Sequence, residues 1–164
     1  MQTHLNNKIL ILVVIQHNQR MLNSFRTWTG RELISRTGST EQDTRILFES
    51  DFAVVSHGTE SDPIFKYGNK KALELFEMSW EEFTQTPSRN SAEPVEQEQR
   101  ARFMEQVTRD GFVDNYEGIR VSKTGRRFLV KNAIVWNVLD YDGKYCGQAA
   151  TFSEWSYLQT VCKL

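Results

Sequence analysis

Cysteine is scarce in this chain of 164 residues, which contains only Cys146 and Cys162. These two residues do not form a CxxC motif, and neither lies in a cluster with histidine at the spacing of zinc ligands. We therefore predict neither a disulfide framework nor a metal site. Free thiols are typical of a reducing compartment, so we expect a cytoplasmic location.

An excess of basic residues is also absent, because 20 Lys and Arg residues stand against 21 Asp and Glu residues, for a net charge of −1. The basic residues alternate with acidic ones and form no stripe that would follow a phosphate backbone. We therefore expect no nucleic-acid partner.

Long hydrophobic runs are missing as well. The run ILILVVI at residues 9–15 is far shorter than the ~20 apolar residues of a membrane span. A signal peptide would need a small-residue cleavage site after this run, whereas the sequence that follows continues a helical pattern. We therefore expect no membrane partner.

What remains is the composition of one globular domain, with 39% hydrophobic and 25% charged residues. Apolar residues recur at helical spacing over residues 11–28, which predicts a helix of about four turns whose apolar face needs a partner. Gly30 ends this pattern. Ser39 with Gln42 then predicts the start of a second short helix.

Strand patterns follow the second helix. The segments DFAVVSH and PIFKYG flank a polar turn and predict a hairpin. Asn69 is a suitable N-cap for a helix in KKALELFEM, and Ser79 with Glu82 predicts a capping box before WEEF. A longer helix over residues 95–110 ends at Gly111.

Three strand patterns fill the last third of the chain, at residues 112–121, 126–139 and 144–155. The short turns KTG and DYDG separate them, so neighbouring strands must be antiparallel. The whole order predicts an α+β domain, with short helices on one face of a five-stranded antiparallel sheet and a helical extension before it.

Several motifs in this order resemble a known family. The segment DPIFKYGNKKALELFEMSWEEF and the closing hairpin are similar to PAS domains. More specifically, SHGTESDPIFKYGNKKALELFE, PSRNSAEP, GRRFLVKNAIVWN and GQAATF resemble the bacterial and algal branch of the PAS-like MEKHLA family. The resemblance divides the chain into a helical extension (1–45), a PAS-like MEKHLA domain (46–155) and a tail (156–164).

The resemblance implies a sensing or dimer-controlling module, by analogy with plant class III homeodomain leucine-zipper proteins, which carry MEKHLA at their C-terminus. This sequence contains neither a homeodomain nor a zipper. We therefore expect the N-terminal helix to pair two copies into a homodimer. A fold alone assigns no chemistry, so candidate residues need their own argument.

A ligand pocket is predicted between the sheet and the helices. The period-two rule puts six side chains of one strand on one face: Phe128, Val130, Asn132, Ile134, Trp136 and Val138. Asn132 is the polar member of that row, and Gln148 on the next strand is expected to converge with it. Small residues beside Gln148 leave volume for a small molecule. We predict a binding set of Asn132, Gln148, Trp136 and Arg89, with His57 at its edge, and a filled core as the alternative.

Arginine side chains offer a second signal. Arg89 and Arg120 are suited to bind an acidic ligand through bidentate hydrogen bonds. Ion pairs with Glu93 or Glu117 are the alternative interpretation.

Ser56, His57 and Asp62 supply the side chains of a hydrolytic triad. Adjacent strand residues point to opposite faces, however, and no nucleophile elbow accompanies them. In the alternative interpretation His57, Thr59 and Asp62 bond to the backbone of the hairpin turn.

The cofactor is not assigned by the sequence. A covalent flavin photosensor of the PAS fold needs a cysteine in a motif like NCRFLQ, where this chain has TPSRNSAEP, and Cys146 lies on the last strand. Haem needs an axial histidine on a central helix, whereas His4, His17 and His57 lie elsewhere. Neither group is supported.

The sequence thus predicts a PAS-like sensory module that binds a small molecule or a protein partner and signals through homodimerisation, rather than an enzyme. One alternative is a small enzyme with His57 as general base and Arg89 or Arg120 holding an anionic substrate. Another is a dimerisation scaffold without a ligand.

Overall fold

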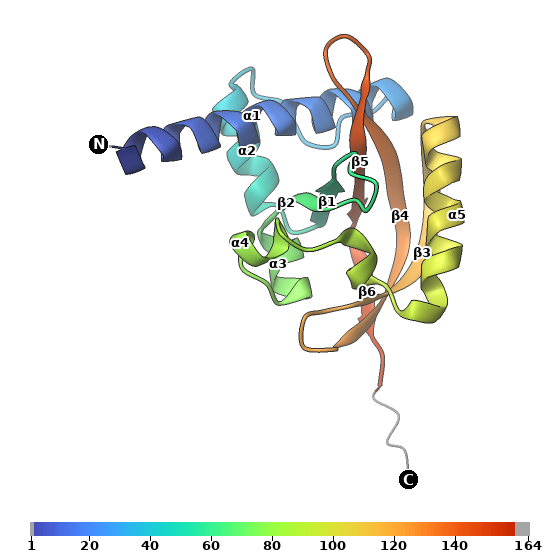
Figure 1. The fold of residues 1–164 in the computed structure, drawn as a ribbon. Helices are drawn as coiled ribbons and strands as arrows, with labels where there is room; N and C mark the ends of the chain where they lie inside the picture. The colour runs from blue at the N-terminus through green and yellow to red at the C-terminus, as the bar shows by residue number, and fades with distance from the viewer. Residues whose placement is uncertain (1, 160–164) are drawn as a thin grey trace.

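The computed structural model describes residues 2–159, except for the side chains of residues 2–5 and 94–97. Its described strands are β1 (Ala53–His57), β2 (Phe65–Gly68), β3 (Phe112–Val121), β4 (Arg127–Leu139), β5 (Tyr145–Phe152) and β6 (Glu154–Tyr157). They form an antiparallel sheet in the order β2-β1-β5-β4-β3, and β6 pairs with β4. The predicted α+β fold is confirmed, and β6 occupies the end of the expected fifth strand (Figure 1).

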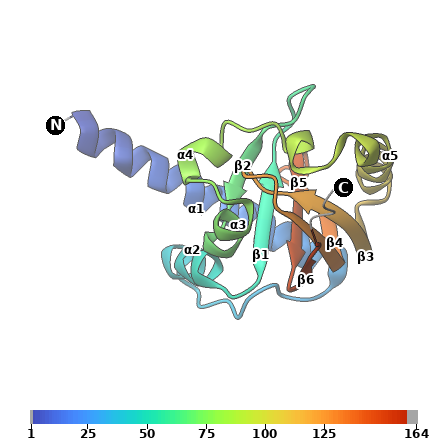
Figure 2. The same ribbon diagram turned by 90° about the horizontal axis from the view of Figure 1, so that it is seen from below.

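Helices cover both faces of this sheet. They are α1 (Gln2–Thr29), α2 (Thr40–Glu49), α3 (Lys70–Phe76), α4 (Trp80–Phe83), the 3-10 helix η1 (Ser88–Ser91) and α5 (Pro94–Asp110). We call the face covered by α1 and α2 the outer face. We call the face covered by α3, α4, η1 and α5 the inner face (Figures 1 and 2).

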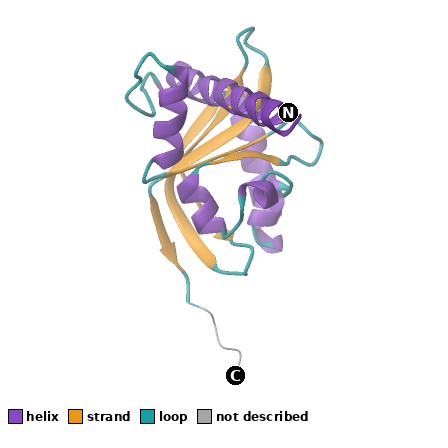
Figure 3. Cartoon of the chain, turned by 90° about the vertical axis from the view of Figure 1, so that its left-hand side faces the viewer, coloured by secondary structure: helices purple, strands orange, loops and turns teal. Residues whose placement is uncertain are grey.

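Each face has its own hydrophobic core. On the outer face, Met21, Leu22 and Phe25 of α1 pack with Val54 of β1 and Trp136 of β4. Figure 3 shows α1 lying across the strands. Full burial of such a side chain contributes roughly 1.5–3 kcal/mol, so this contact is the main attachment of α1 to the sheet.

The inner core is rich in phenylalanine. Phe65 stacks on Phe83 with ring centroids 4.2 Å apart, and Phe76 contacts Phe128 edge to face at 5.4 Å. These rings join β2, α3, α4 and β4, so they fix the short helices against the sheet. The space that they leave beside η1 and α5 is where a cavity forms.

Local capping signals predicted the short helices correctly. Asn69 is fully buried, and its Oδ1 accepts hydrogen bonds from the backbone N–H of Ala72 and of Val54. Its Nδ2 donates to the carbonyls of Leu47 and Phe52. Asn69 therefore caps α3 and also ties that helix to β1 and to the end of α2.

Helix α1 is longer than the four turns that the apolar spacing predicted. Its residues from Ile9 to Val13 are between 52% and 64% exposed, whereas Met21 and Leu22 are fully buried. The N-terminal half therefore projects past the sheet with an uncovered apolar surface (Figure 1). Among the described residues no helix combines the length and the hydropathy of a membrane span.

A β-bulge in β4 overturns the predicted row of side chains. Val130 pairs with Gly118 and Ala133 with Tyr116, so β4 has one more residue than β3 between these two pairs. Asn132 adopts a left-handed conformation in this bulge, with φ of +53°. The extra residue reverses the alternation, because a shift of one residue moves each later side chain to the other face.

Candidate functional site: a cavity on the inner face of the sheet

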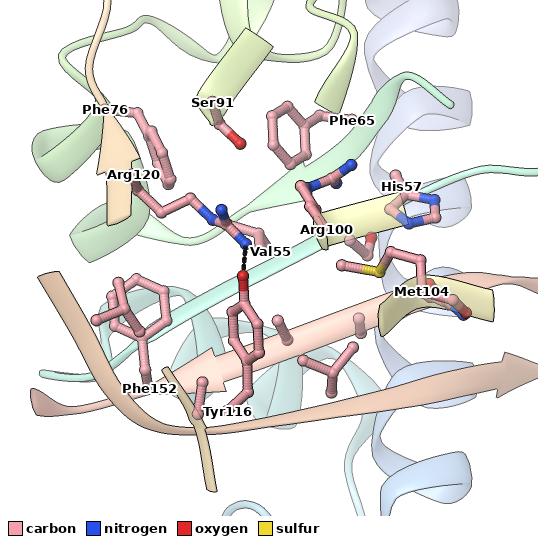
Figure 4. A pocket seen from close by; sticks show the side chains of 17 residues that line it. Val55, His57, Phe65, Phe76, Ser91, Arg100, Met104, Tyr116, Arg120 and Phe152 are labelled. Atoms are coloured by element: carbon pink, nitrogen blue, oxygen red, sulfur yellow. Dashed lines mark hydrogen bonds between the residues drawn. The ribbon is translucent and has the colours of Figure 1, made fainter. Parts of the chain in front are cut away.

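The inner face encloses a cavity of about 50 Å³ between the sheet, α3, η1 and α5. Its walls are mostly apolar and include Phe65, Phe76, Val135 and Phe152, with the small side chain of Ala150 at one side. Pockets for drug-sized ligands hold roughly 300–1,000 Å³, so this cavity suits a molecule of only a few heavy atoms. Figure 4 shows the polar side chains that also reach it.

Arg120 reaches the cavity from β3 and is only 9% exposed. Its Nη2 donates to the hydroxyl of Tyr116 at 2.7 Å, and its Nη1 donates to the carbonyl of Ile119 at 3.2 Å. The guanidinium carbon also lies 5.3 Å from the centroid of the Tyr116 ring. All of these partners are neutral, so the charge of Arg120 is oriented but not neutralised by them.

Arg100 approaches the same cavity from α5 (Figure 4). Its Nη2 donates to Ser88 Oγ at 2.9 Å, while its Nε is buried and has no hydrogen-bond partner. Burial lowers the pKa of Arg100 to about 10, and the positive charge of Arg120 adds to that effect. The two guanidinium groups therefore repel each other across a space of low polarity.

His57 and Gln148 form part of the wall near Arg100. The two residues face each other on β1 and β5, and Nδ1 of His57 lies 2.9 Å from the carbonyl oxygen of Gly58. Burial lowers the pKa of His57, which favours a neutral ring near neutral pH. Gln148 Nε2 donates to the carbonyl of Met104 at 3.0 Å, which fixes the side chain against α5.

A second, open groove of about 730 Å³ lies on the other side of this wall from the cavity. We call it the outer groove; it is not on the outer face of the sheet. It shares four residues with the inner cavity: His57, Arg100, Met104 and Gln148. A rearrangement of these side chains would connect the cavity with solvent. The wall between α5 and the β1–β5 pair therefore separates the cavity from this groove.

Ser56 lies next to His57 in β1 and also borders the cavity, but its side chain bonds to α1 on the outer face. Its Oγ is 2.7 Å from Nε2 of His17 in α1. Burial, followed by the charges of Lys66 and Arg20, lowers the pKa of His17 to about 4. The neutral His17 ring thus forms a buried polar contact between α1 and β1.

The model of the MEKHLA domain matches residues 15–157. The chain belongs to the MEKHLA family. A search of curated proteins found no match. The family match begins inside α1 and ends at the last residue of β6, so it includes both faces of the sheet and the whole inner cavity.

Solved structures similar to this MEKHLA domain include a PAS domain, a light-oxygen-voltage receptor and a blue-light photoreceptor. A PAS domain from Colwellia psychrerythraea has 16% identity and a TM-score of 0.59, covering 68% of this chain and 92% of that one. The light-state dimer of the fungal blue-light photoreceptor Vivid has 14% identity and a TM-score of 0.56, covering 84% and 91%. An RNA-binding light-oxygen-voltage receptor has 16% identity and a TM-score of 0.58, covering 73% of this chain and 34% of its own length. At these identities the likeness shows the PAS fold.

The MEKHLA domain brings only part of the predicted binding set together. Gln148 and His57 meet at the cavity wall, and Arg89 lies in the outer groove, where its Nε donates to Asp62 at 3.0 Å. Trp136 is fully buried on the outer face, where its Nε1 donates to the carbonyl of Met21 at 3.1 Å. Asn132 is exposed and donates to Glu154 at 3.1 Å.

The expected convergence of Asn132 with Gln148 is therefore wrong. Asn132 borders a shallow depression on the outer face beside Phe25, whereas Gln148 lines the inner cavity. The cause is the bulge in β4, because the period-two rule assumes that the alternation of side chains continues unbroken along the strand. The residue that meets Gln148 is Asn137, which was not in the predicted row of alternate residues. Its Oδ1 accepts a hydrogen bond from Gln148 Nε2 at 3.2 Å.

Arg100 was not among the site residues predicted from the sequence. The signal was present, because Arg100 precedes the inward-pointing Phe103 and Met104 by three and four residues, which places all three on one side of a helix. Arg120 was proposed as an anion ligand, and it does line the cavity. In the described part of the chain Arg120 forms no ion pair with Glu117, its expected alternative partner, and Glu93 pairs with Arg127.

The cavity does not fit a flavin or a haem in this arrangement, because its volume of about 50 Å³ is far below that of either ring system. Cys146 is half-buried on β5, and its Sγ donates to the carbonyl of Val138 rather than lining the cavity. Within the described part of the chain, no three His, Cys, Asp or Glu side chains gather at one point that suits a metal ion.

Proposed function

We propose that this MEKHLA domain is a cytoplasmic sensory module that binds a small molecule in its inner cavity and signals through α1 as a homodimer. In this proposal residues 46–155 form the sensory core and residues 1–45 form the output extension. The PAS fold of the chain supports the proposal, because this fold presents a ligand-sized space on one side of a sheet.

The observation that carries the proposal is the position of β1 between the cavity and α1. His57 is part of the cavity wall, and the preceding residue, Ser56, is hydrogen-bonded to His17 of α1. A ligand that moves the backbone at His57 must also move Ser56, because the two residues share a peptide bond. The shift would then alter a buried polar contact that holds α1 on the sheet.

The close packing between β1 and β5 supports this coupling. A Cβ atom placed on Gly147 would lie 2.1 Å from the carbonyl oxygen of His57, so the two strands approach too closely for any side chain there. Gly147 also has a φ of +138°. A displacement of β5 at Gly147 would therefore also displace the β1 backbone at His57.

The output surface in this proposal is the N-terminal half of α1. Ile9, Leu10, Ile11, Leu12 and Val13 are successive residues with more than half of their surface exposed. Five neighbouring apolar residues surround the helix rather than forming one stripe, and a helix that is apolar on all sides is normally buried. A second copy of α1 would cover this surface, and ligand binding would shift the pair between two packings that differ by a few kcal/mol.

Native mass spectrometry of the protein purified from its own organism tests both parts of this proposal. We expect a dimer that carries an additional small mass, and we expect that mass to dissociate on unfolding. A dimer without any bound molecule would favour the ligand-free scaffold. A monomer that carries a turned-over product in its cavity would favour the enzyme with His57 as base.

A further inference from the structure

The inner cavity contains two positive charges without a described negative partner. Arg120 is 9% exposed and bonds only to neutral oxygens, on Tyr116 and Ile119. Arg100 bonds to the neutral Ser88 Oγ and keeps a buried Nε without any partner. Among the side chains that the structure describes, no carboxylate forms an ion pair with either guanidinium.

Such an arrangement of charges is unfavourable by itself. A buried charge loses its hydration, and two like charges near one cavity also repel each other. The negative charge of Asp62, in the outer groove, opposes these effects on Arg100 less strongly, and Asp62 is already bound by Arg89 through both of its oxygens, at 3.0 and 3.1 Å. An anion inside the cavity would neutralise the excess charge and would satisfy the unpaired Nε–H of Arg100.

Three features limit the class of anion. The volume of about 50 Å³ admits only a few heavy atoms, and most of the lining is apolar. A guanidinium binds the two oxygens of a carboxylate in a bidentate manner. A polyanion such as phosphate would leave polar oxygens against the apolar walls of Phe65 and Phe152, whereas a short alkyl chain fits them.

We infer that the cavity binds a short-chain aliphatic monocarboxylate, with its carboxylate between Arg100 and Arg120 and its alkyl group against the phenylalanine-lined wall. The inference rests on the proposed small-molecule function and specifies its ligand. Arg100 also belongs to the wall shared with the outer groove, so the anion would meet this positive charge on entry.

Isothermal titration calorimetry and thermal melting with defined probes test this inference. The probes are propionate and butyrate, the neutral propionamide and butyramide of matched shape, and inorganic phosphate. We expect the carboxylates to bind and to raise the melting temperature, and we expect the amides and phosphate to do neither. Equal binding of amides and carboxylates would overturn the inference, as would tighter binding of phosphate.

Matched arginine variants locate the site. Arg120→Gln and Arg100→Gln should each weaken propionate binding at least about thirty-fold, because each removes one charged partner of a buried carboxylate. Arg102→Gln, at an exposed position of α5 that lines neither the cavity nor the outer groove, should stay within about twofold of the wild type. Wild-type affinity in both cavity variants would overturn the inference. If one cavity variant does not fold, the other, on a different element, gives the same test.

The stability of the ligand-free variants gives a separate readout. Arg100→Met removes a buried charge and keeps the side-chain volume, so we expect a higher melting temperature without ligand and no further rise with propionate. A lower melting temperature would assign Arg100 a structural role and contradict the inference. If the wild type binds a neutral molecule instead, the carboxylate inference is wrong and the proposed sensory function stands. If it binds no probe and carries no molecule, both the inference and the proposed function are wrong.

Discussion

Ser56 and His57 are adjacent in β1 and both border the inner cavity, but the Ser56 side chain bonds to α1 on the outer face. Ser56 Oγ lies 2.7 Å from His17 of α1, and His57 contributes to the wall of the inner cavity. The polar segment that begins at Ser56 therefore connects the cavity wall with α1. The serine and the histidine of the candidate triad do not face each other.

Ser56→Ala should destabilise the protein by about 1–3 kcal/mol, because it leaves Nε2 of His17 buried without a partner. Urea denaturation measures this loss. Thr59→Ala, at an exposed position of the same segment, is the matched control and should change stability by no more than about 0.5 kcal/mol. Equal effects of the two substitutions would mean that the Ser56–His17 contact does not hold α1.

The pH dependence of stability should show the burial of His17. Its pKa falls from 6.5 to about 4 on folding, so the unfolded chain takes up the proton first as the pH drops. Stability is then full above the unfolded pKa and is lost as the pH falls toward the folded one. We expect the wild type to lose about 2 kcal/mol between about pH 7 and pH 5 that a His17→Gln variant does not lose.

Urea titrations of both proteins at several pH values measure this difference. The pKa of His57 is also lowered by burial, but His57 is present in both proteins, so its contribution cancels in the comparison. Parallel stability curves for the two proteins would contradict the account of His17.

Leu12→Asp should convert the proposed dimer to a monomer, because Leu12 is 64% exposed within the uncovered apolar part of α1. Sedimentation velocity measures the change. Thr27→Asp places the same charge at an exposed position near the other end of α1 and should leave the dimer intact. A dimer that tolerates Leu12→Asp would require a different interface.

The bulge at Asn132 gives a test of the fold. Asn132→Leu should cost about 1–2 kcal/mol, since a leucine is strained at φ of +53°, while Asn132→Gly should be close to neutral. Thermal melting compares the two variants. Neither substitution should change ligand affinity, because Asn132 is on the outer face. A loss of binding without a loss of stability would show that Asn132 belongs to the binding site.

Sequence reasoning succeeded where the signal was local. The N-caps at Asn69 and Ser79 are set by residues within one turn, and both form as predicted. The alternation in β1 likewise separated Ser56 from His57 correctly. These features depend on neighbouring residues along the chain, which the sequence displays directly.

The site was less accessible to that reasoning because it depends on the pairing of distant strands. The bulge at Asn132 arises in the register between β3 and β4, and it moved Trp136 to the outer face. Arg100 lies in the helix predicted over residues 95–110, and only the packing of α5 on the sheet makes it part of the cavity. The helices and strands could be predicted from the sequence. Which of their side chains face the cavity depends on how the strands pair and how α5 packs on them.

Hydrogen–deuterium exchange with and without propionate tests the central claim most directly, namely that occupancy of the inner cavity changes the packing of α1. We predict slower exchange in β1 and β5 around His57 and Gln148, together with altered exchange in α1 around His17. Protection confined to the cavity lining, with α1 unchanged at saturating propionate, would contradict the claim.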